Sequence, residues 1–281
     1  MAFLDFNDIS YTYTPVQGDF DAQGNNIAPK PVFQHFTGSI PSGFTSLIGP
    51  NGSGKSTFMM IASGRLIPDS GSVKLFDQDL SLLDDTQKNL LASVIYQNME
   101  FESEDKVKDL LAYVYQNGNF KGKAKAINSE TDLFNEVIDV FELHKVLEHG
   151  LTQLSKGEIQ RVLLAFSILY GSASIFMDEP LFAMEQYQKE NSLKYLREFN
   201  HKTGTAIFIS MHELDLTKKY ADKVLLFYPD RNIDYGTVEE VVTPEALEKA
   251  YGIPAAMLKD KESMTREELE DFDKLMKAGR K

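Results

Sequence analysis

Residues 44–65 read FTSLIGPNGSGKSTFMMIASGR, and in this stretch a glycine-rich loop joins an apolar strand candidate, 44–48, to an apolar helix candidate, 58–65. The loop matches the pattern G-x-x-x-x-G-K-[ST], which binds phosphate where it lies between a strand and a helix. It consists of Gly49, Pro50, Asn51, Gly52, Ser53, Gly54, Lys55, Ser56 and Thr57. The sequence therefore predicts a phosphate-binding loop at 49–57.

The residue types in this loop suit a polyphosphate. Glycines let consecutive backbone N–H groups approach an anion without a clash from Cβ, and the N-terminus of the following helix adds partial positive charge. We expect Lys55 to reach the β- and γ-phosphates of a nucleotide and Ser56 to ligate Mg²⁺. The alternative is a glycine-rich turn that binds nothing, and the flanking strand and helix argue against it.

The composition of the chain argues against several classes of site and partner. The chain has 281 residues, with 29 Lys and Arg against 42 Asp and Glu, a formal charge of −13 and no cysteine. The lack of cysteine excludes disulfides, thiolate metal sites and a cysteine nucleophile. The acidic balance argues against a nucleic-acid partner, which usually meets a basic face. The longest uncharged run, 162–177, is shorter than the roughly 20 apolar residues that cross a bilayer, so we expect a cytoplasmic protein without a membrane span.

Strand and helix candidates alternate along most of the chain. The expected strands are 3–13, 33–40, 44–48, 72–76, 92–96, 173–177, 205–209 and 223–228, and the later helices are 156–170, 184–201 and 212–219. Short, fully apolar strands between helices are typical of a parallel sheet buried on both faces. We therefore predict an α/β fold, a P-loop NTPase core with a mainly parallel sheet and an N-terminal antiparallel β part.

The pattern changes in the middle and at the end of the chain. Residues 99–154 show apolar side chains at helical spacing and predict an inserted α-helical subdomain, with 117–129 as its flexible connection. This insert separates the phosphate-loop half of the core, 1–98, from the second half, 155–254. The charged extension 255–281 is expected to be a surface helix or a frayed end, and 14–31, rich in Pro, Gly, Asn and Asp, a loop.

A second motif combines an apolar strand with two carboxylates, Ser-Ile-Phe-Met-Asp-Glu-Pro at 174–180. At the end of the strand, Asp178 is placed to hold the hydration shell of Mg²⁺. Glu179 follows at the carboxyl edge of the sheet, where ligands bind in open α/β folds, and can polarise a water that attacks a γ-phosphate. A solvated helix cap is the alternative for an isolated Asp-Glu pair.

The stretch Leu-Ser-Lys-Gly-Glu-Ile-Gln-Arg at 154–161 completes a set of motifs whose order resembles that of the ATP-binding-cassette (ABC) ATPases. The family's signature reads Leu-Ser-Gly-Gly-Gln, so Lys156 and Glu158 depart from it, whereas Ser155 and Gly157 are retained and by resemblance touch the γ-phosphate. Ser155 is also suited to cap the helix that follows. Taken alone, this stretch is an ordinary helix start.

The resemblance also assigns roles to isolated side chains. Gln97 matches the glutamine that senses Mg²⁺ and the attacking water, and His212 matches the switch histidine that contacts the γ-phosphate. Glu185 stands where the family usually has an aspartate that couples the two sites of a dimer. Either Tyr13 or Tyr11 resembles the aromatic that stacks on adenine, with Tyr13 preferred by spacing, and plain strand packing is the alternative for both.

The resemblance implies an ATPase that uses ATP and Mg²⁺ and pairs head to tail with a second cassette in a homodimer. With one cassette and no span, the leading interpretation is the ATP-hydrolysing subunit of a transporter, peripheral on the inner face of the membrane and bound to separate permease subunits. The segment 242–254 resembles the C-terminal part of ATPases that import iron chelates, haem and cobalamin, which adds a substrate-binding protein as an indirect partner. A generic amphipathic helix is the alternative for this segment.

Two other functions stay open at this point. A soluble ABC ATPase can serve as an assembly scaffold, for instance for iron–sulfur clusters. A cassette can also act in DNA repair or translation, although the acidic charge of the chain and its single cassette speak against nucleic-acid work.

Overall fold

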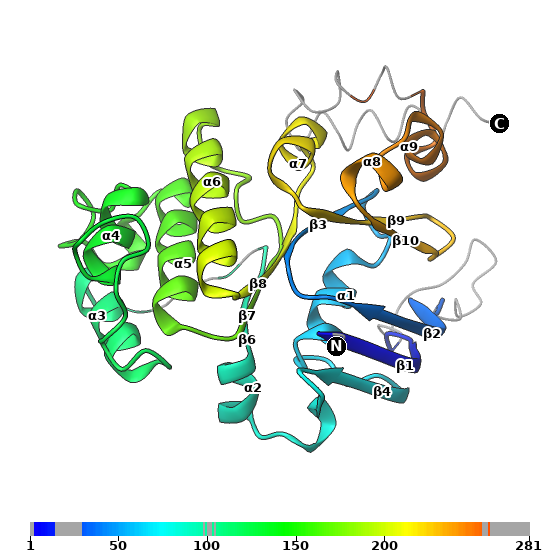
Figure 1. Ribbon diagram of the computed structural model, residues 1–281, viewed down its shortest axis with the longest axis horizontal. Coiled ribbons are helices and arrows are strands. Elements are labelled where there is room, and N and C mark those ends of the chain that lie inside the picture. The colour runs from blue at the N-terminus through cyan, green and yellow to red at the C-terminus, as the bar shows by residue number, and fades with distance from the viewer. Residues whose placement is uncertain are drawn as a thin grey trace, which may run out of the picture.

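The computed structural model describes residues 3–14, 30–97, 99, 103, 105–254 and 258. Its centre is a six-stranded sheet in the order β10-β9-β3-β8-β7-β6 (Figure 1). The strands are β3 (Phe44–Ile48), β6 (Ala92–Ile95), β7 (Ser174–Met177), β8 (Ala206–Ser210), β9 (Lys223–Phe227) and β10 (Ile233–Gly236). Neighbouring strands run parallel except β9 and β10, which are antiparallel. The predicted mainly parallel sheet is confirmed.

A four-stranded antiparallel sheet, in the order β2-β1-β4-β5, lies beside the large sheet. Its strands are β1 (Leu4–Tyr11), β2 (Phe33–Ile40), β4 (Ser70–Leu75) and β5 (Gln78–Asp79). Leu4 of the central strand β1 faces Ile40 on one side and Leu75 on the other. This sheet is the predicted N-terminal antiparallel part. Most of the expected loop 14–31 lies outside the described residues.

One face of the large sheet is covered by α1 (Lys55–Ala62) and the small sheet. Phe176, Phe208 and Phe227 point to this face and share an apolar cluster with Phe58 of α1. Phe176 and Phe208 stack with ring centroids 4.9 Å apart. Because successive side chains of a strand point to opposite faces, the neighbours of these phenylalanines in the sequence must pack on the other side.

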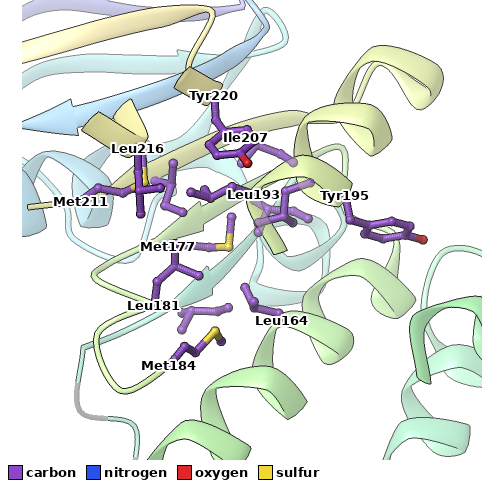
Figure 2. Packing of buried hydrophobic residues seen from close by; sticks show 14 of the residues in the cluster. Leu164, Met177, Leu181, Met184, Leu193, Tyr195, Ile207, Met211, Leu216 and Tyr220 are labelled. Atoms are coloured by element: carbon purple, nitrogen blue, oxygen red, sulfur yellow. The ribbon is translucent and has the colours of Figure 1, made fainter. Parts of the chain in front are cut away.

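The other face carries the helices α5 (Lys156–Tyr170), α6 (Gln186–Thr203) and α7 (Leu214–Tyr220). Figure 2 shows this second core, in which Leu164 of α5 and Leu193 of α6 lie near Met177 and Ile207 of the sheet. The apolar runs of the central strands are therefore explained by burial on both faces, as the sequence predicts.

The helical part lies beyond α5 and consists of α3 (Val107–Asn117) and α4 (Leu133–Val140), which both pack against α5 (Figure 1). The segment 117–129, which the sequence analysis expects to be a flexible connection, is hydrogen-bonded to α4 at its C-terminal end. The backbone N–H groups of Ile127 and Asn128 donate to the buried carboxylate of Glu136, at 2.9 and 2.7 Å. These hydrogen bonds to a buried carboxylate hold the end of the segment against α4.

Several element boundaries differ from the predicted ones for local reasons. Helix α1 begins at Lys55, three residues before the predicted start, because Gly54 with φ 109° turns the loop directly into the helix. Helix α7 begins at Leu214, so His212 precedes it. The elements not predicted are short: α2 (Asp85–Leu91), α8 (Val238–Val241), β5, β10, and the 3₁₀ turns η1 (Leu80–Leu82) and η2 (Leu151–Gln153).

The C-terminal described segment contains α9 (Pro244–Tyr251), which is the amphipathic helix weighed for 242–254. Thr243 caps its start, and Gly252, in the left-handed conformation at φ 69°, ends it. The predicted surface helix or frayed end at 255–281 lies outside the described residues, apart from Leu258. Within the described part of the chain, no helix has the length and apolar character that crossing a membrane requires.

Candidate functional site

Four neighbouring strands of the large sheet end at the candidate site. Loop 49–57 follows β3, Gln97 follows β6, Asp178 and Glu179 follow β7, and His212 follows β8. These strands are adjacent and parallel, in the order β3-β8-β7-β6. Their carboxyl ends therefore meet at one edge, where open α/β sheets bind ligands. The structure brings together residues that the sequence holds in separate motifs, and we call this group the strand-edge site.

Lys55 is buried inside the phosphate-binding loop. Its Nζ donates to the carbonyl oxygens of Gly49, at 2.8 Å, and Pro50, at 3.1 Å. Burial lowers the pKa of Lys55, and the nearby carboxylates of Glu179 and Asp178 oppose that shift. The Ser53 hydroxyl is also buried and has no hydrogen-bond partner among the described residues. A buried ammonium and an unpartnered hydroxyl in one glycine-rich loop suit an anionic ligand.

The carboxylate of Glu179 is held through both of its oxygens. His212 Nε2 lies 2.6 Å from Oε1, and Gln97 Nε2 donates to Oε2. Burial alone would raise the pKa of Glu179, but the hydrogen bond and charge of His212, the charge of Lys55 and the hydrogen bond from Gln97 hold it below its ordinary value. The group is therefore ionised at neutral pH, which is the state that a general base needs.

Ser210 links the two carboxylate residues, and the sequence analysis missed it. Its hydroxyl donates to Asp178 Oδ1 at 2.6 Å and accepts the backbone N–H of Glu179 at 2.8 Å. Glu179 has φ 50°, a left-handed conformation that costs a non-glycine residue about 1 kcal/mol or more. Ser210 thus holds Glu179 in a strained geometry. The signal that could have marked Ser210 is its position at the end of strand β8. This strand lies beside β7, and Asp178 directly follows β7.

The two tyrosines considered for adenine stacking differ in exposure. Tyr11 is 8% exposed and packs in the core, whereas Tyr13 is 46% exposed. The hydroxyl of Tyr13 lies 3.1 Å from Thr57 Oγ1 of the phosphate-binding loop. Tyr13 is therefore the one of the two with an accessible ring beside the loop.

The oxygen donors expected to ligate Mg²⁺ come from separate elements. Ser56 offers an exposed hydroxyl at the start of α1, Asp178 a carboxylate after β7 and Gln97 an amide after β6. The described residues contain no group of three or more His, Asp or Glu side chains arranged for a metal. Mg²⁺ usually takes one or two protein oxygens and completes its shell with water and substrate phosphates. The donor set therefore fits Mg²⁺ that arrives with a nucleotide.

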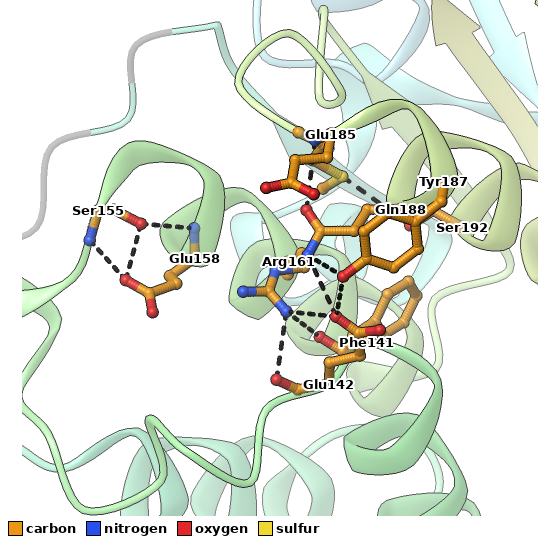
Figure 3. Close-up of polar contacts among 10 residues, drawn as sticks. Phe141, Glu142, Ser155, Glu158, Arg161, Glu185, Tyr187, Gln188 and Ser192 are labelled. Carbon is orange, nitrogen blue, oxygen red and sulfur yellow. Dashed lines mark hydrogen bonds and ion pairs between the residues drawn. The ribbon is translucent and has the colours of Figure 1, made fainter.

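The start of α5 is built differently from the strand-edge site. Ser155 caps the helix, and Glu158 Oε2 accepts both the backbone N–H of Ser155, at 2.8 Å, and its hydroxyl, at 2.7 Å (Figure 3). These hydrogen bonds lower the pKa of Glu158. The expected capping role of Ser155 is confirmed. We call 155–158 the signature start, in which Ser155 and Lys156 are exposed and Gly157 and Glu158 are partly buried.

Gly157 in the signature start packs against the loop that follows Glu179. A Cβ atom at Gly157 would approach the carbonyl oxygen of Ala183 to 2.6 Å, so only glycine fits without a shift. Gln160 Oε1 accepts the backbone N–H of Ala183 at 2.9 Å. The signature start and loop 179–185 therefore form one packed unit, and close packing alone is a reason for glycine at this position.

A polar network connects this unit to the helical part. Arg161 donates to the carbonyl oxygens of Phe141, at 3.0 Å, and Glu142, at 3.2 Å, after α4 (Figure 3). The carboxylate of Glu142 accepts the hydroxyl of Tyr187, at 3.0 Å, and the amide of Gln188, at 3.1 Å, at the start of α6. Glu185 is the residue before α6, and its N–H donates to Gln188 at 3.3 Å.

The helices that begin at the phosphate-binding loop and at the signature start pack on opposite faces of the large sheet. The helix that follows loop 49–57 is α1, which packs on one face, and the helix that follows Ser155 is α5, which packs on the other (Figure 1). The structure therefore brings together the phosphate-binding loop, Gln97, the carboxylates and His212. It does not add Ser155 and Gly157 to them, since their hydrogen-bond and packing partners are Glu158 and Ala183.

Comparisons with known proteins agree with this geometry. The ABC transporter family matches residues 34–182. The chain is 28% identical over 224 residues, 79% of its length and 87% of the relative's, to the petrobactin import ATP-binding protein YclP of Bacillus subtilis (strain 168). It is also 28% identical, over 79% of this chain and 87% of the relative, to the hemin import ATP-binding protein HmuV of Escherichia coli O157:H7.

A solved structure shares the fold. It is a dimeric ATP-binding cassette in a post-hydrolysis state, bound to ADP and phosphate. It superposes on this chain with a TM-score of 0.68 at 20% identity, covering 84% of this chain and 98% of the other. The combination of a mainly parallel sheet, an antiparallel sheet and a helical part is therefore that of an ATP-binding cassette.

Proposed function

The chain belongs to the ABC transporter family, and on that premise we propose that it is the ATP-hydrolysing subunit of an importer for an iron chelate, haem or a related cargo. The cargo class rests on its relatives, which are named for petrobactin and hemin import. These names favour transport over the assembly and nucleic-acid alternatives.

The observation that carries the proposal is the position of the Glu179 carboxylate. It lies between His212 and Gln97 at the edge of the sheet that also presents loop 49–57. We assign Glu179 as the base that orients a water molecule toward the γ-phosphate and accepts its proton. In that assignment His212 and Gln97 hold the base, and Asp178 lies next to it.

In this proposal the phosphate-binding loop binds the phosphates of ATP. Backbone N–H groups of 49–57 and the ammonium of Lys55 balance the charge of the phosphates against an acidic chain of formal charge −13. The exposed ring of Tyr13 is proposed to stack on adenine, because its hydroxyl contacts Thr57 of the same loop.

Mg²⁺ is proposed to bind with ATP at Ser56 and Asp178, with the Gln97 amide as a further oxygen ligand. When bound, it neutralises charge on the phosphates. Ser210 supports this site from the protein side, because its hydroxyl fixes one oxygen of Asp178.

A second copy of the chain is proposed to complete the site. Helix α5, which begins at the signature start, packs on the face of the sheet opposite to α1. We propose that the signature start meets the nucleotide of another subunit rather than that of its own chain. In a head-to-tail homodimer, Ser155 and Gly157 of one subunit would contact the γ-phosphate held by the other. The dimeric cassette that shares this fold supports the arrangement.

An import function requires further protein partners. Separate permease subunits would supply the membrane path, with the helical subdomain 99–154 between the core halves 1–98 and 155–254 as their docking part. The subunit would then sit at the inner face of the membrane, and a substrate-binding protein would deliver the cargo. One of the two departures from the family signature, Lys156, adds a positive charge beside the proposed phosphate contact.

Glu179→Gln tests the assignment. We expect ATP turnover to fall about a hundredfold or more, because a general base contributes at least that much, while ATP binding stays intact. Glu190→Gln is the matched control, since Glu190 lies on α6 and its carboxylate pairs with Lys219 of α7. Turnover of the Glu179→Gln variant near the wild-type rate would refute the assignment.

A further inference from the structure

The C-terminal helix α9 touches the base of the phosphate-binding loop. The hydroxyl of Tyr251, the last residue of α9, accepts the backbone N–H of Gly49 at 3.0 Å. The two residues are 202 positions apart in the chain. Gly49 is the first residue of the loop and directly follows strand β3.

Strand β9 limits the backbone conformation of Gly49 from the opposite side. Gly49 has φ 141°, and a Cβ atom there would approach the carbonyl oxygen of Phe227 in β9 to 2.5 Å. Phe227 therefore limits Gly49 from one side, and Tyr251 fixes its N–H. Because a buried N–H without a partner is costly, the hydroxyl of Tyr251 is the group that satisfies this donor.

The carbonyl group of the same residue supports Lys55. Lys55 Nζ donates to the carbonyl oxygen of Gly49 at 2.8 Å. Gly49 thus supplies one of the two carbonyl oxygens that hold the ammonium, the other being that of Pro50. A short chain of contacts runs from Tyr251 through Gly49 to Lys55. Since Lys55 is proposed to bind the phosphates, this chain reaches the nucleotide.

Helix α9 is anchored independently of the Tyr251 hydroxyl. Leu247 and Ala250 of α9, together with Ile253, are buried in the core formed with α5–α7. Lys249 Nζ lies 4.3 Å from the centre of the Tyr228 ring. Loss of the hydroxyl alone would therefore leave the helix in place.

We propose that Tyr251 is a positioning residue for the phosphate-binding loop, through which helix α9 sets the affinity of the site for nucleotide. This inference rests on the proposed function, since it assumes that loop 49–57 binds ATP. It makes the C-terminal segment a part of the nucleotide site rather than a passive extension of the fold. Tyr251 acts through Gly49 and Lys55 and does not itself touch the proposed reacting atoms.

The test compares two variants of the full chain that each lose one hydroxyl. Tyr251→Phe keeps the ring and removes the acceptor for Gly49. Tyr228→Phe, the matched control, removes a hydroxyl that donates to Asp234 at 2.6 Å in the β9–β10 hairpin. ATP affinity is measured by calorimetry, and kcat and KM by phosphate release.

For Tyr251→Phe we expect the Kd and KM for ATP to rise about fivefold, the change given by one hydrogen bond of ordinary strength, with kcat within about twofold of wild type. Tyr228→Phe should leave Kd and KM unchanged even if it lowers thermal stability. A role of Tyr251 in folding alone would lower stability and active fraction without raising the KM.

Amide exchange gives a second measurement that needs no nucleotide. Tyr251→Phe should speed exchange in peptides covering 49–57, whereas Tyr228→Phe should not. The inference is overturned if Tyr251→Phe binds ATP like wild type, if both variants weaken binding equally, or if exchange at 49–57 is unchanged. If wild type and Tyr228→Phe neither bind nor hydrolyse ATP, the proposed function fails instead.

Discussion

The strand-edge site and the signature start use their polar groups in opposite ways. At the strand edge, Glu179 is partly buried and bound by residues that follow neighbouring strands, His212 and Gln97. At the signature start, Ser155 is exposed and bound by Glu158, three residues away on the same helix. The first region is a set of distant residues fixed by the sheet, and the second is a local helix cap that presents itself to solvent.

The two arrangements indicate where each kind of function can reside. The strand-edge site is assembled within one chain, so phosphate binding and base chemistry should depend on that chain alone. The signature start has its own local hydrogen bonds satisfied and faces outward, so its proposed contribution requires a second copy. Variants in the two regions should therefore differ in which property they remove.

The largest effect is expected from Lys55→Ala at the strand edge. Removal of the buried ammonium should reduce ATP turnover about a hundredfold or more and weaken nucleotide binding, because the main positive charge for the phosphates is lost. Calorimetry with ATP and a phosphate-release assay measure the two effects. Lys219→Ala, which removes a surface partner of Glu190, is the control. Undiminished ATP binding by Lys55→Ala would contradict the proposed role of the loop.

A smaller effect is expected from Ser210→Ala. The variant loses the bond to Asp178 and the acceptor for the Glu179 N–H, so we expect kcat to fall roughly tenfold, equivalent to about one hydrogen bond lost in the transition state. Ser174→Ala is a matched control, because its hydroxyl donates to Leu91 O at the opposite end of β7. Equal losses in the two variants would show that Ser210 acts only through packing.

The smallest effect on the strand edge is expected from Glu136→Gln in the helical part. The buried carboxylate of Glu136 accepts hydrogen bonds from Ile127, Asn128, Ser129 and Tyr195. We expect the free energy of unfolding to fall by about 1–3 kcal/mol, as for hydrogen bonds to a buried charged group, while ATP affinity is unchanged. Weaker ATP binding would mean that the two regions are coupled more closely than their contacts indicate.

The stabilisation by Glu136 should depend on pH. Burial would raise its pKa, but the hydrogen bonds from Ile127 and Asn128, with those of Tyr195 and Ser129, hold it below the ordinary value of 4.5. A carboxyl group with a lowered folded-state pKa stabilises the protein above its unfolded-state pKa and loses that effect as the pH falls through the folded-state value. Denaturation at pH 7 and in acid should show a difference between wild type and Glu136→Gln that becomes smaller as the pH falls.

The parts of the structure that could be predicted from the sequence are those encoded locally. The loop 49–57 has its pattern and its flanking strand and helix in one stretch, and the apolar strands around Met177 and Ile207 show their double-sided burial in their composition. Helix α5 matches its predicted bounds, Lys156–Tyr170, because Ser155 with Glu158 forms a recognisable start and Gly171 an end.

The missed features depend on contacts between distant residues. Strand β10, with partly exposed residues on a sheet edge, lacks an apolar run and exists through pairing with β9. Ser210 becomes notable only because β8 lies beside β7. Tyr251 reaches Gly49 across 202 positions. The segment 117–129 looked flexible because its Lys and Gly residues gave no sign of the carboxylate of Glu136 that holds it.

In the proposed homodimer, each nucleotide site combines the strand-edge site of one chain with the signature start of the other. Ser155→Asp provides the second variant needed for a test, because aspartate still caps a helix but places negative charge at the proposed phosphate contact. Ser155→Asn, which caps without charge, is its control. Alone, both Lys55→Ala and Ser155→Asp should be inactive.

The most direct measurement is the ATPase activity of an equimolar mixture of Lys55→Ala and Ser155→Asp proteins. If sites form between chains, each mixed dimer has one intact site, and the mixture should regain roughly a quarter of wild-type turnover, because random pairing makes half of the dimers mixed. If each chain completes its own site, every site in the mixture carries a defect. No recovery of activity, with the Ser155→Asn control active, would contradict the account.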